Sequence, residues 1–318
     1  VFINETFHNA PGVFPPPVPG GGSTKFYWNA WDDMQVTPNN GGGGGVVVNT
    51  KSFIKYSQPP VEIQEQPGMI IGWDEPSVYF PGQIIMADDW ECRDERPVTD
   101  IHWWGSFLGW TQPTIPRFLL PKAFHIGIWT DVPKGADPEF PFSHPGVLIW
   151  ENYCDNYVWN FAGYDKDPRS WTENEACFQF NQLLSQDEWF RQSPQADPQV
   201  PNVYWLSISA IYDPDQPVSH PWGWKTRDHF FNDDAVRIFG IINPDGTFWP
   251  PNSLVVGQSK FAVGAPVEFP EGVSWDLAFE LTTNQRPPCH KLQGDLNHDC
   301  KVDLQDFAIL ASEWLMTE

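Results

Sequence analysis

The stretch Tyr204-Trp205-Leu206-Ser207-Ile208-Ser209-Ala210-Ile211 decides the fold class. Tyr204, Leu206, Ile208 and Ala210 alternate along it with the residues between them. A period of two places the two sets on opposite faces of a β-sheet. The same alternation occurs at residues 124–129 and 275–282. We therefore expect a protein that is mainly β.

Working outward from this stretch, shorter segments of the same character predict further strands at residues 83–87, 99–107, 146–153, 157–162 and 235–241. Proline-rich segments, such as 113–121 and 133–145, separate them. Many short strands with Pro and Gly between them are typical of a β-sandwich. The sequence thus predicts a two-sheet β-sandwich, of jelly-roll or immunoglobulin-like type, with long proline-rich loops. One helix is expected after Ser185, which forms a capping box with Glu188.

The composition divides the chain into three parts. Residues 1–50 combine Pro15-Pro16-Pro17 with glycine runs at 20–22 and 41–45, residues 51–284 hold the strand pattern, and residues 285–318 differ from both. Polyproline is extended and polyglycine is flexible. The first part is either a disordered tail or an arm that adds a strand to another subunit. In the second case the assembly residues are the apolar Val1, Phe2, Ile3 and Phe7.

The charge of the chain excludes several classes of partner. With 18 Lys and Arg against 41 Asp and Glu, the 318 residues carry a formal net charge of −23. Nucleic acids and anionic lipids bind basic patches, so neither is an expected partner. No apolar run approaches the ~18 residues of a membrane span, so we expect no membrane insertion. No signal peptide opens the sequence, and we expect Val1 to follow a processing site.

The five cysteines bear on the compartment. None has the spacing of a zinc site. Cys289 and Cys300 bracket a short acidic loop, and Cys154 and Cys177 bracket an aromatic-rich one, so the simplest pairing is two disulfides with Cys92 free. The alternative is five buried thiols in a reducing compartment. The acidity and a calcium-type loop favour the first pairing, and with it secretion or display at the cell surface.

That loop is residues 295–306, Asp-Leu-Asn-His-Asp-Cys-Lys-Val-Asp-Leu-Gln-Asp. Oxygen ligands at positions 1, 3, 5, 9 and 12, with a backbone carbonyl at position 7, match the spacing of a twelve-residue calcium loop. The predicted Ca²⁺ ligands are Asp295, Asn297, Asp299, Lys301, Asp303 and Asp306. The spacing of Phe307, Leu310, Ala311 and Trp314 predicts an apolar helix face behind the loop. The alternative is an acidic helix cap without metal.

Residues 294–315 resemble one dockerin-type repeat, on this loop together with Asp306-Phe307-Ala308-Ile309-Leu310 and Trp314-Leu315. Dockerins are cellulosome modules that bind calcium and then a cohesin. The resemblance implies Ca²⁺ at the six residues above and a cohesin-like protein as partner. That family carries two repeats and this chain has one, so the alternative is a segment that packs on the sandwich.

Several central segments carry a second resemblance: 55–60, 87–90, 100–106, 204–206, 222–226 and 232–235. Together they make residues 51–284 similar to a domain of unknown function from secreted planctomycete-type bacterial proteins. The resemblance implies an extracellular β-domain, often followed by a dockerin-like repeat. It implies no activity and no catalytic residues.

Two further groups of side chains allow more than one interpretation. The paired acids Asp88, Asp89, Asp233 and Asp234, with Glu91 nearby, form a second cation site, cap loops, or serve as the two carboxylates of a glycoside hydrolase, about 5–10 Å apart. Trp103, Trp104, Trp110, Trp205, Trp222 and Trp224 either stack on sugars or fill the core.

These observations predict a secreted, non-enzymatic structural or adhesive subunit of an extracellular surface assembly, stabilised by Ca²⁺ and self-associating as a homo-oligomer or filament. The alternative is a carbohydrate-binding module of a polysaccharide-degrading system, recruited through its dockerin-like tail. A glycoside hydrolase is the third alternative, although the common hydrolase, metalloprotease and nucleotide-binding motifs are absent.

Overall fold

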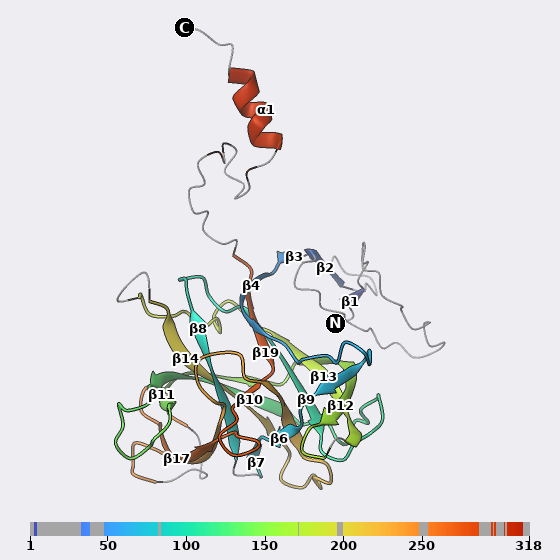
Figure 1. The fold of residues 1–318 in the computed structure, drawn as a ribbon, viewed down its shortest axis with the longest axis vertical. Coiled ribbons are helices and arrows are strands. Elements are labelled where there is room, and N and C mark those ends of the chain that lie inside the picture. The colour runs from blue at the N-terminus through green and yellow to red at the C-terminus, as the bar shows by residue number, and fades with distance from the viewer. Residues whose placement is uncertain are drawn as a thin grey trace.

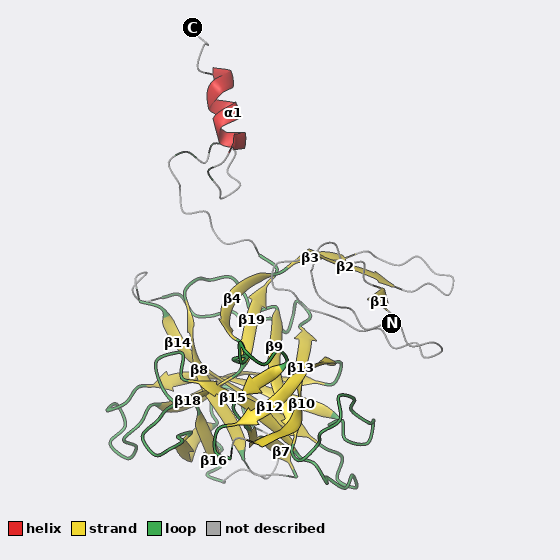
Figure 2. Cartoon of the chain, turned by 45° about the vertical axis from the view of Figure 1, so that its right-hand side comes forward, coloured by secondary structure: helices red, strands yellow, loops and turns green. Residues whose placement is uncertain are grey.

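The computed structural model describes residues 3–4, 33–38, 48–81, 84–170, 172–195, 200–247, 254–285, 294, 296, 302 and 304–313. Within them the chain is mainly β (Figure 1). Two large sheets pack against each other, which confirms the predicted β-sandwich, and a small third sheet lies N-terminal to them (Figure 2).

The elements fall into these groups. The three-stranded sheet comprises β1 (Ile3–Asn4), β2 (Asp33–Pro38) and β3 (Val48–Lys51). The seven-stranded sheet comprises β7 (Val78–Phe80), β8 (Ile85–Cys92), β10 (Ala123–Val132), β11 (His144–Cys154), β14 (Asn202–Ile211), β16 (Val236–Ile242) and β17 (Lys260–Pro266). The nine-stranded sheet comprises β4 (Phe53–Gln58), β5 (Met69–Ile71), β6 (Asp74–Pro76), β9 (Asp100–Phe107), β12 (Val158–Asp167), β13 (Thr172–Leu183), β15 (Trp222–Asp228), β18 (Trp275–Leu277) and β19 (Phe279–Thr283). The helix α1 spans Leu304–Glu313.

Aromatic side chains fill the space between the two large sheets. The ring of Phe124 in β10 lies 5.1 Å from that of Trp103 in β9 and 5.3 Å from that of Phe180 in β13, centroid to centroid. All three side chains are fully buried. Each such ring removes roughly 150–250 Å² from water. At about 25 cal/mol per Å², this interface is the main stabilising contact of the sandwich.

The seven-stranded sheet closes on itself. Its order is β10-β11-β17-β16-β8-β14-β7, and β14 also pairs with β10, so six of its strands form a ring. The seam between β11 and β17 is short, with Val147 opposite Lys260. The ring has an apolar interior of its own, in which Trp129, Trp205 and Phe261 are buried apart from the inter-sheet core.

The nine-stranded sheet contains a second ring. Its order runs β15-β9-β13-β12-β5, while β6, which follows β5 almost directly in the chain, pairs back onto β15. Two backbone hydrogen bonds continue the closure between β5 and β6: Gly72 N–H donates to the Lys166 carbonyl, and Thr226 N–H donates to the Trp73 carbonyl. Gly72 has a φ of +118°, and a Cβ there would lie 2.5 Å from the Thr226 carbonyl oxygen. Only glycine lets the chain turn at this point.

Two predictions about elements need correction. The expected helix after Ser185 is a single turn, and only half of its capping box forms: Ser185 N–H donates to Glu188 Oε2 at 2.9 Å, while Ser185 Oγ donates to the same oxygen at 2.5 Å instead of accepting from Glu188 N–H. The predicted strand over 275–282 is divided at Ala278, because β18 pairs with β15 whereas β19 pairs with β4 and β9.

The N-terminal arm is described only in part. Val1, Phe2 and Phe7 lie outside the described residues, and Ile3 lies in β1, opposite Pro38 of β2 in the same chain. Pairing of the arm with another subunit therefore stays a prediction. Within the described part of the chain, no helix has the length and apolar character that crossing a bilayer requires.

Candidate functional site

The most unusual group in the described structure is Lys225, a charged side chain with no exposed surface. It lies in β15, where Trp222 and Trp224 face the inter-sheet core. Alternation places Lys225 on the opposite face of the strand. That face would meet water in an open sheet, but here it lies inside the second ring.

Two carboxyl groups flank the Lys225 ammonium. Its Nζ lies 2.7 Å from Oδ1 of Asp165 in β12 and 3.6 Å from Oδ2 of Asp74 in β6. All three side chains are buried. The 2.7 Å contact is not aligned as a hydrogen bond, and both oxygens of Asp74 lack a hydrogen-bond donor among the described groups. The pairing of β12 with β5 and of β6 with β15 places the two carboxyl groups beside the amine.

Three further side chains complete this cluster, which we call the lysine site. Ser106 Oγ in β9 donates to Asp165 Oδ2 at 3.1 Å, and the buried Cys177 lies on β13 opposite Ser106. Glu175, half-buried, accepts a hydrogen bond from Gly109 N–H at 2.7 Å. One carboxylate oxygen from each of Asp74, Asp165 and Glu175 lies within 4.8 Å of the others.

Burial dominates the electrostatics of the lysine site. It raises the pKa of Asp165 well above the ordinary value, and the Asp74 charge raises it further. It also raises the pKa of Glu175, to about 7, again with help from Asp74. Burial lowers the pKa of Lys225, but the two aspartates outweigh it and raise that pKa overall. Protons are thus shared between the amine and the acids inside the ring.

The three carboxylates are the group in the described residues with the spacing of metal ligands. Oxygen ligands at such distances suit a hard divalent cation. The Lys225 ammonium already lies against two of them, however, so a cation would have to displace a buried positive charge. The arrangement brings a primary amine against a carboxyl group, with a second carboxyl group beside them.

A second acidic group links the two large sheets. Asp88 in β8 accepts hydrogen bonds through Oδ2 from Gln58 Nε2 at 2.7 Å and from Leu277 N–H at 2.6 Å. Nearby, Asp276 in β18 accepts from the backbone N–H groups of Phe230 and Phe231 at 2.6 and 3.0 Å. Burial raises the pKa of both carboxyl groups.

Asp89 faces the other way, into the interior of the first ring, as do its β8 neighbours Ile85 and Ala87. Its Oδ2 accepts from Asn232 Nδ2 at 2.8 Å, and the same amide donates to Asp233 at 2.6 Å. Asn232 has a φ of +40°, in the left-handed region that Asn tolerates. Burial raises the pKa of Asp89 to about 9, although the Asn232 hydrogen bond lowers it.

The predicted second cation site is therefore divided. Asp88 and Asp89 lie on opposite faces of β8. Asp233 lies beside Asn232, while Asp234 accepts a hydrogen bond from Ser274 Oγ. The four acids do not form a group with metal-ligand spacing within the described residues. They serve mainly as acceptors for backbone and amide donors, which is the loop-capping interpretation.

The match to known families covers most of this structure. Residues 54–282 match a family described as "Domain of unknown function (DUF7901)". The chain belongs to this family. No curated protein and no solved structure matches it. The boundaries of the DUF7901 domain coincide with β4 and β19, the first and last strands of the sandwich.

The DUF7901 domain corrects two predictions about its side chains. Four of the six tryptophans of the expected sugar platform have no exposed surface: Trp103, Trp205, Trp222 and Trp224. The predicted Cys154–Cys177 disulfide is wrong, because both are free, buried thiols. Cys154 lies in the seven-stranded sheet and Cys177 in the nine-stranded one, with aromatic core between them. Cys289 and Cys300 lie outside the described residues.

The predicted calcium loop, C-terminal to the DUF7901 domain, is described only at Leu296, Val302 and residues 304–306. Asp306 in α1 is buried, and its Oδ1 accepts a hydrogen bond from Leu296 N–H at 2.7 Å. This bond joins positions 2 and 12 of the loop. The other predicted ligands, Asp295, Asn297, Asp299, Lys301 and Asp303, lie outside the described residues.

Sequence reasoning missed the lysine site of the DUF7901 domain entirely. The signal was the sequence Trp222-Gly223-Trp224-Lys225, in which two tryptophans mark the core face of a strand. A lysine on the other face is usually solvated. Its burial follows from the closure of the second ring, which alternation does not predict.

Proposed function

We propose that this DUF7901 chain is a secreted, non-catalytic structural subunit of an extracellular assembly, joined to its neighbours by strand addition. The observation that carries the proposal is the distribution of free strand edges. The two rings remove most edges from the large sheets. Within the described residues, β4 forms a ladder with β19 alone, so its other edge is open.

The open edge lies where the chain enters the domain. β3 ends at Lys51, and β4 begins at Phe53, so the three-stranded sheet leads directly into β4. Open edges accept strands from other chains. A Val1–Phe7 segment from a second copy would pair here, with main-chain hydrogen bonds supplying affinity and its apolar side chains supplying register.

The buried acids support a structural role over a catalytic one. Asp88 and Asp276 accept hydrogen bonds from backbone N–H groups of β18 and of the β15–β16 loop. A carboxylate that accepts hydrogen bonds from buried N–H donors has a structural role. The net charge of −23 and the acidic loop support secretion, since extracellular calcium modules rely on many carboxylates.

The C-terminal segment supports a further attachment point. Phe307 and Leu310 of α1 are 64% and 43% exposed. Exposed apolar side chains on one helix face suit a protein partner. We propose that Ca²⁺ orders the loop 295–306 and that α1 then binds a cohesin-like protein.

Electron microscopy of the full chain tests the assembly proposal. We expect filaments or sheets that loosen in a calcium chelator, and discrete particles from a variant that lacks residues 1–10. The thermal midpoint of that variant should equal that of the full chain, because the sandwich begins at β4.

Assembly that survives the deletion would overturn the role of the arm. Discrete monomers of the full chain, with and without Ca²⁺, would overturn the assembly proposal altogether. Titration with soluble glycans, followed by tryptophan fluorescence, would then test the carbohydrate-binding alternative.

A further inference from the structure

The lysine site contains the reactants for a covalent bond. A primary amine lies 2.7 Å from a carboxyl oxygen, both groups are buried, and strands on opposite sides of β5 and β6 hold them in place. Two groups fixed at this separation react as if at very high concentration. We propose that Lys225 Nζ and Asp165 Cγ condense to an amide, which links β15 to β12 inside the second ring.

The reaction requires neutral reactants, and burial favours them, although the charges of Asp165 and Asp74 raise the pKa of Lys225 overall. An ammonium–carboxylate pair is costly to bury, whereas an amine beside a carboxylic acid carries no charge. Burial raises the pKa of Asp165, so the acid form is accessible there. Transfer of one proton from Lys225 to Asp165 converts the ion pair into the reactive neutral pair.

The step is a dehydration in which atoms and electrons balance. The Nζ lone pair attacks Cγ of the protonated Asp165, and the C–N bond forms as one C–O bond breaks. Nζ loses two hydrogens overall: one has already passed to the Asp165 carboxyl group, and the second leaves with the departing hydroxyl as water. Nothing is oxidised or reduced, so no cofactor is needed.

Asp74 is placed to move the protons. Its Oδ2 lies 3.6 Å from Nζ, and both its oxygens lack other donors among the described groups. A carboxyl group in this position takes a proton from nitrogen and returns it to the leaving hydroxyl, as a general acid and base. Glu175 is the half-buried member of the cluster, whereas Asp74 and Asp165 are buried.

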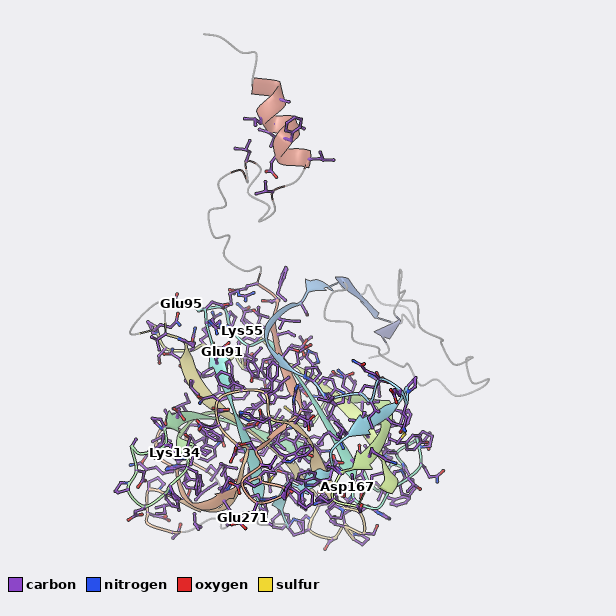
Figure 3. The ribbon with its side chains drawn as sticks, viewed as in Figure 1. Lys55, Glu91, Glu95, Lys134, Asp167 and Glu271 are labelled. Carbon is purple, nitrogen blue, oxygen red and sulfur yellow. The ribbon has the colours of Figure 1, made fainter. Side chains whose placement is uncertain are left out.

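A second lysine–aspartate pair serves as an internal control. Lys55 Nζ in β4 lies 2.9 Å from Asp94 Oδ1, but it donates aligned hydrogen bonds to Asp94, whose side chain is 24% exposed and also binds Arg96. Figure 3 shows Lys55 near Glu91 and Glu95, at a different end of the sandwich from Asp167, which lies two residues beyond Asp165. Burial raises the pKa of Asp94, but the hydrogen bonds from Arg96 and Lys55 outweigh it and lower that pKa to about 2. This pair therefore stays ionised and should remain uncrosslinked.

Mass spectrometry of the denatured full chain tests the proposal. We expect a mass lower than the sequence mass by one water, and a proteolytic digest that contains a branched peptide joining Asp165 to Lys225. Lys55 should appear in linear peptides. The Asp165→Ala variant should have the full mass for its sequence.

A variant that keeps both reactants separates chemistry from folding. Asp74→Asn retains Lys225 and Asp165 but cannot relay the proton, so we expect full mass in a chain with a cooperative thermal transition. Full mass and a linear Lys225 peptide in the wild-type chain would overturn the proposal. So would full mass with a stoichiometric divalent metal in the native protein, which would assign the carboxylates to a cation instead.

Discussion

At the scale of single residues, the structure distinguishes two kinds of buried acid. Those at the lysine site face an amine, whereas Asp89 faces the amide of Asn232 in the interior of the first ring. The difference decides the form of each at neutral pH. Burial raises the pKa of Asp89 to about 9, and the Asn232 hydrogen bond offsets this only in part, so Asp89 keeps its proton at neutral pH.

Asp89→Asn should be tolerated, because an amide has the shape of a protonated carboxyl group. The raised pKa, about 9, means that the folded chain binds this proton more tightly than the unfolded chain. Wild-type stability is therefore lost as the pH rises toward 9. We expect the stability of Asp89→Asn relative to wild type to grow by on the order of 1 kcal/mol per pH unit between pH 6 and 8.

Urea unfolding at several pH values measures this difference. Asp89→Ala is the contrasting variant: it leaves the Asn232 amide without its buried acceptor and should be about 1–3 kcal/mol less stable than Asp89→Asn throughout that range, because neither variant titrates at position 89. Parallel pH profiles for wild type and Asp89→Asn would contradict a protonated Asp89.

At the scale of elements, the second ring depends on the turn between β5 and β6. Gly72→Ala would place a Cβ 2.5 Å from the Thr226 carbonyl oxygen, at a φ that side chains rarely adopt. We expect a loss of about 3 kcal/mol or more in the free energy of unfolding. Urea denaturation at constant pH measures it.

Gly135→Ala is the matched control for Gly72→Ala. Gly135 also has a positive φ, +88°, but nothing lies within 4 Å of the position of its Cβ. The free energy of unfolding of this variant should fall by only about 1–2 kcal/mol, which is the cost of a positive φ at a residue that has a Cβ. Equal losses for the two variants would mean that the close approach to β15 does not hold the ring together.

The elements also show how far the sequence could predict the fold. Period-two alternation predicted strands at β10 and β14, although both faces of each strand are buried, one in the inter-sheet core and the other in the interior of the first ring. Alternation assigns faces but does not identify neighbours, so neither ring was predicted. The hydrogen bond from Ser185 N–H to Glu188 forms without a longer helix, since a local signal stabilises the first turn and tertiary contacts must support the rest.

The same limit explains the candidate site. The acids of β8 were visible as a pair in the sequence, yet adjacent strand residues point to opposite faces, so that pair could not act as one group. Lys225 and Asp165 are separated by many residues and carry no motif. They meet only because β5 and β6 close the ring.

At the scale of the whole molecule, the tail should respond to calcium independently of the sandwich. Phe307 and Leu310 of α1 are exposed rather than packed in either core. The proposed Ca²⁺ would order the helix together with the Asp306–Leu296 hydrogen bond. Chelation should raise the amide hydrogen-exchange rate of residues 304–313 and leave that of β9 and β10 unchanged.

Asp306→Asn should reproduce the effect of chelation on residues 304–313 in the presence of Ca²⁺, because it removes the charge of the ligand predicted at position 12. If neither the chelator nor the Asp306→Asn variant changes the amide exchange rates of α1, Ca²⁺ does not order the tail.

The pairing of β4 with β19 fixes how the domain would carry mechanical load. The chain enters the sandwich at Phe53 and leaves it at Thr283, and these two residues lie opposite each other at one end of the ladder (Figure 1). A pull on the two terminal segments would therefore open this ladder one rung at a time, like a zipper, rather than shear all its hydrogen bonds at once. If neighbouring subunits pulled on the two terminal segments, the force would act on that end of the ladder. The two rings, and the lysine site inside the second ring, would bear none of it.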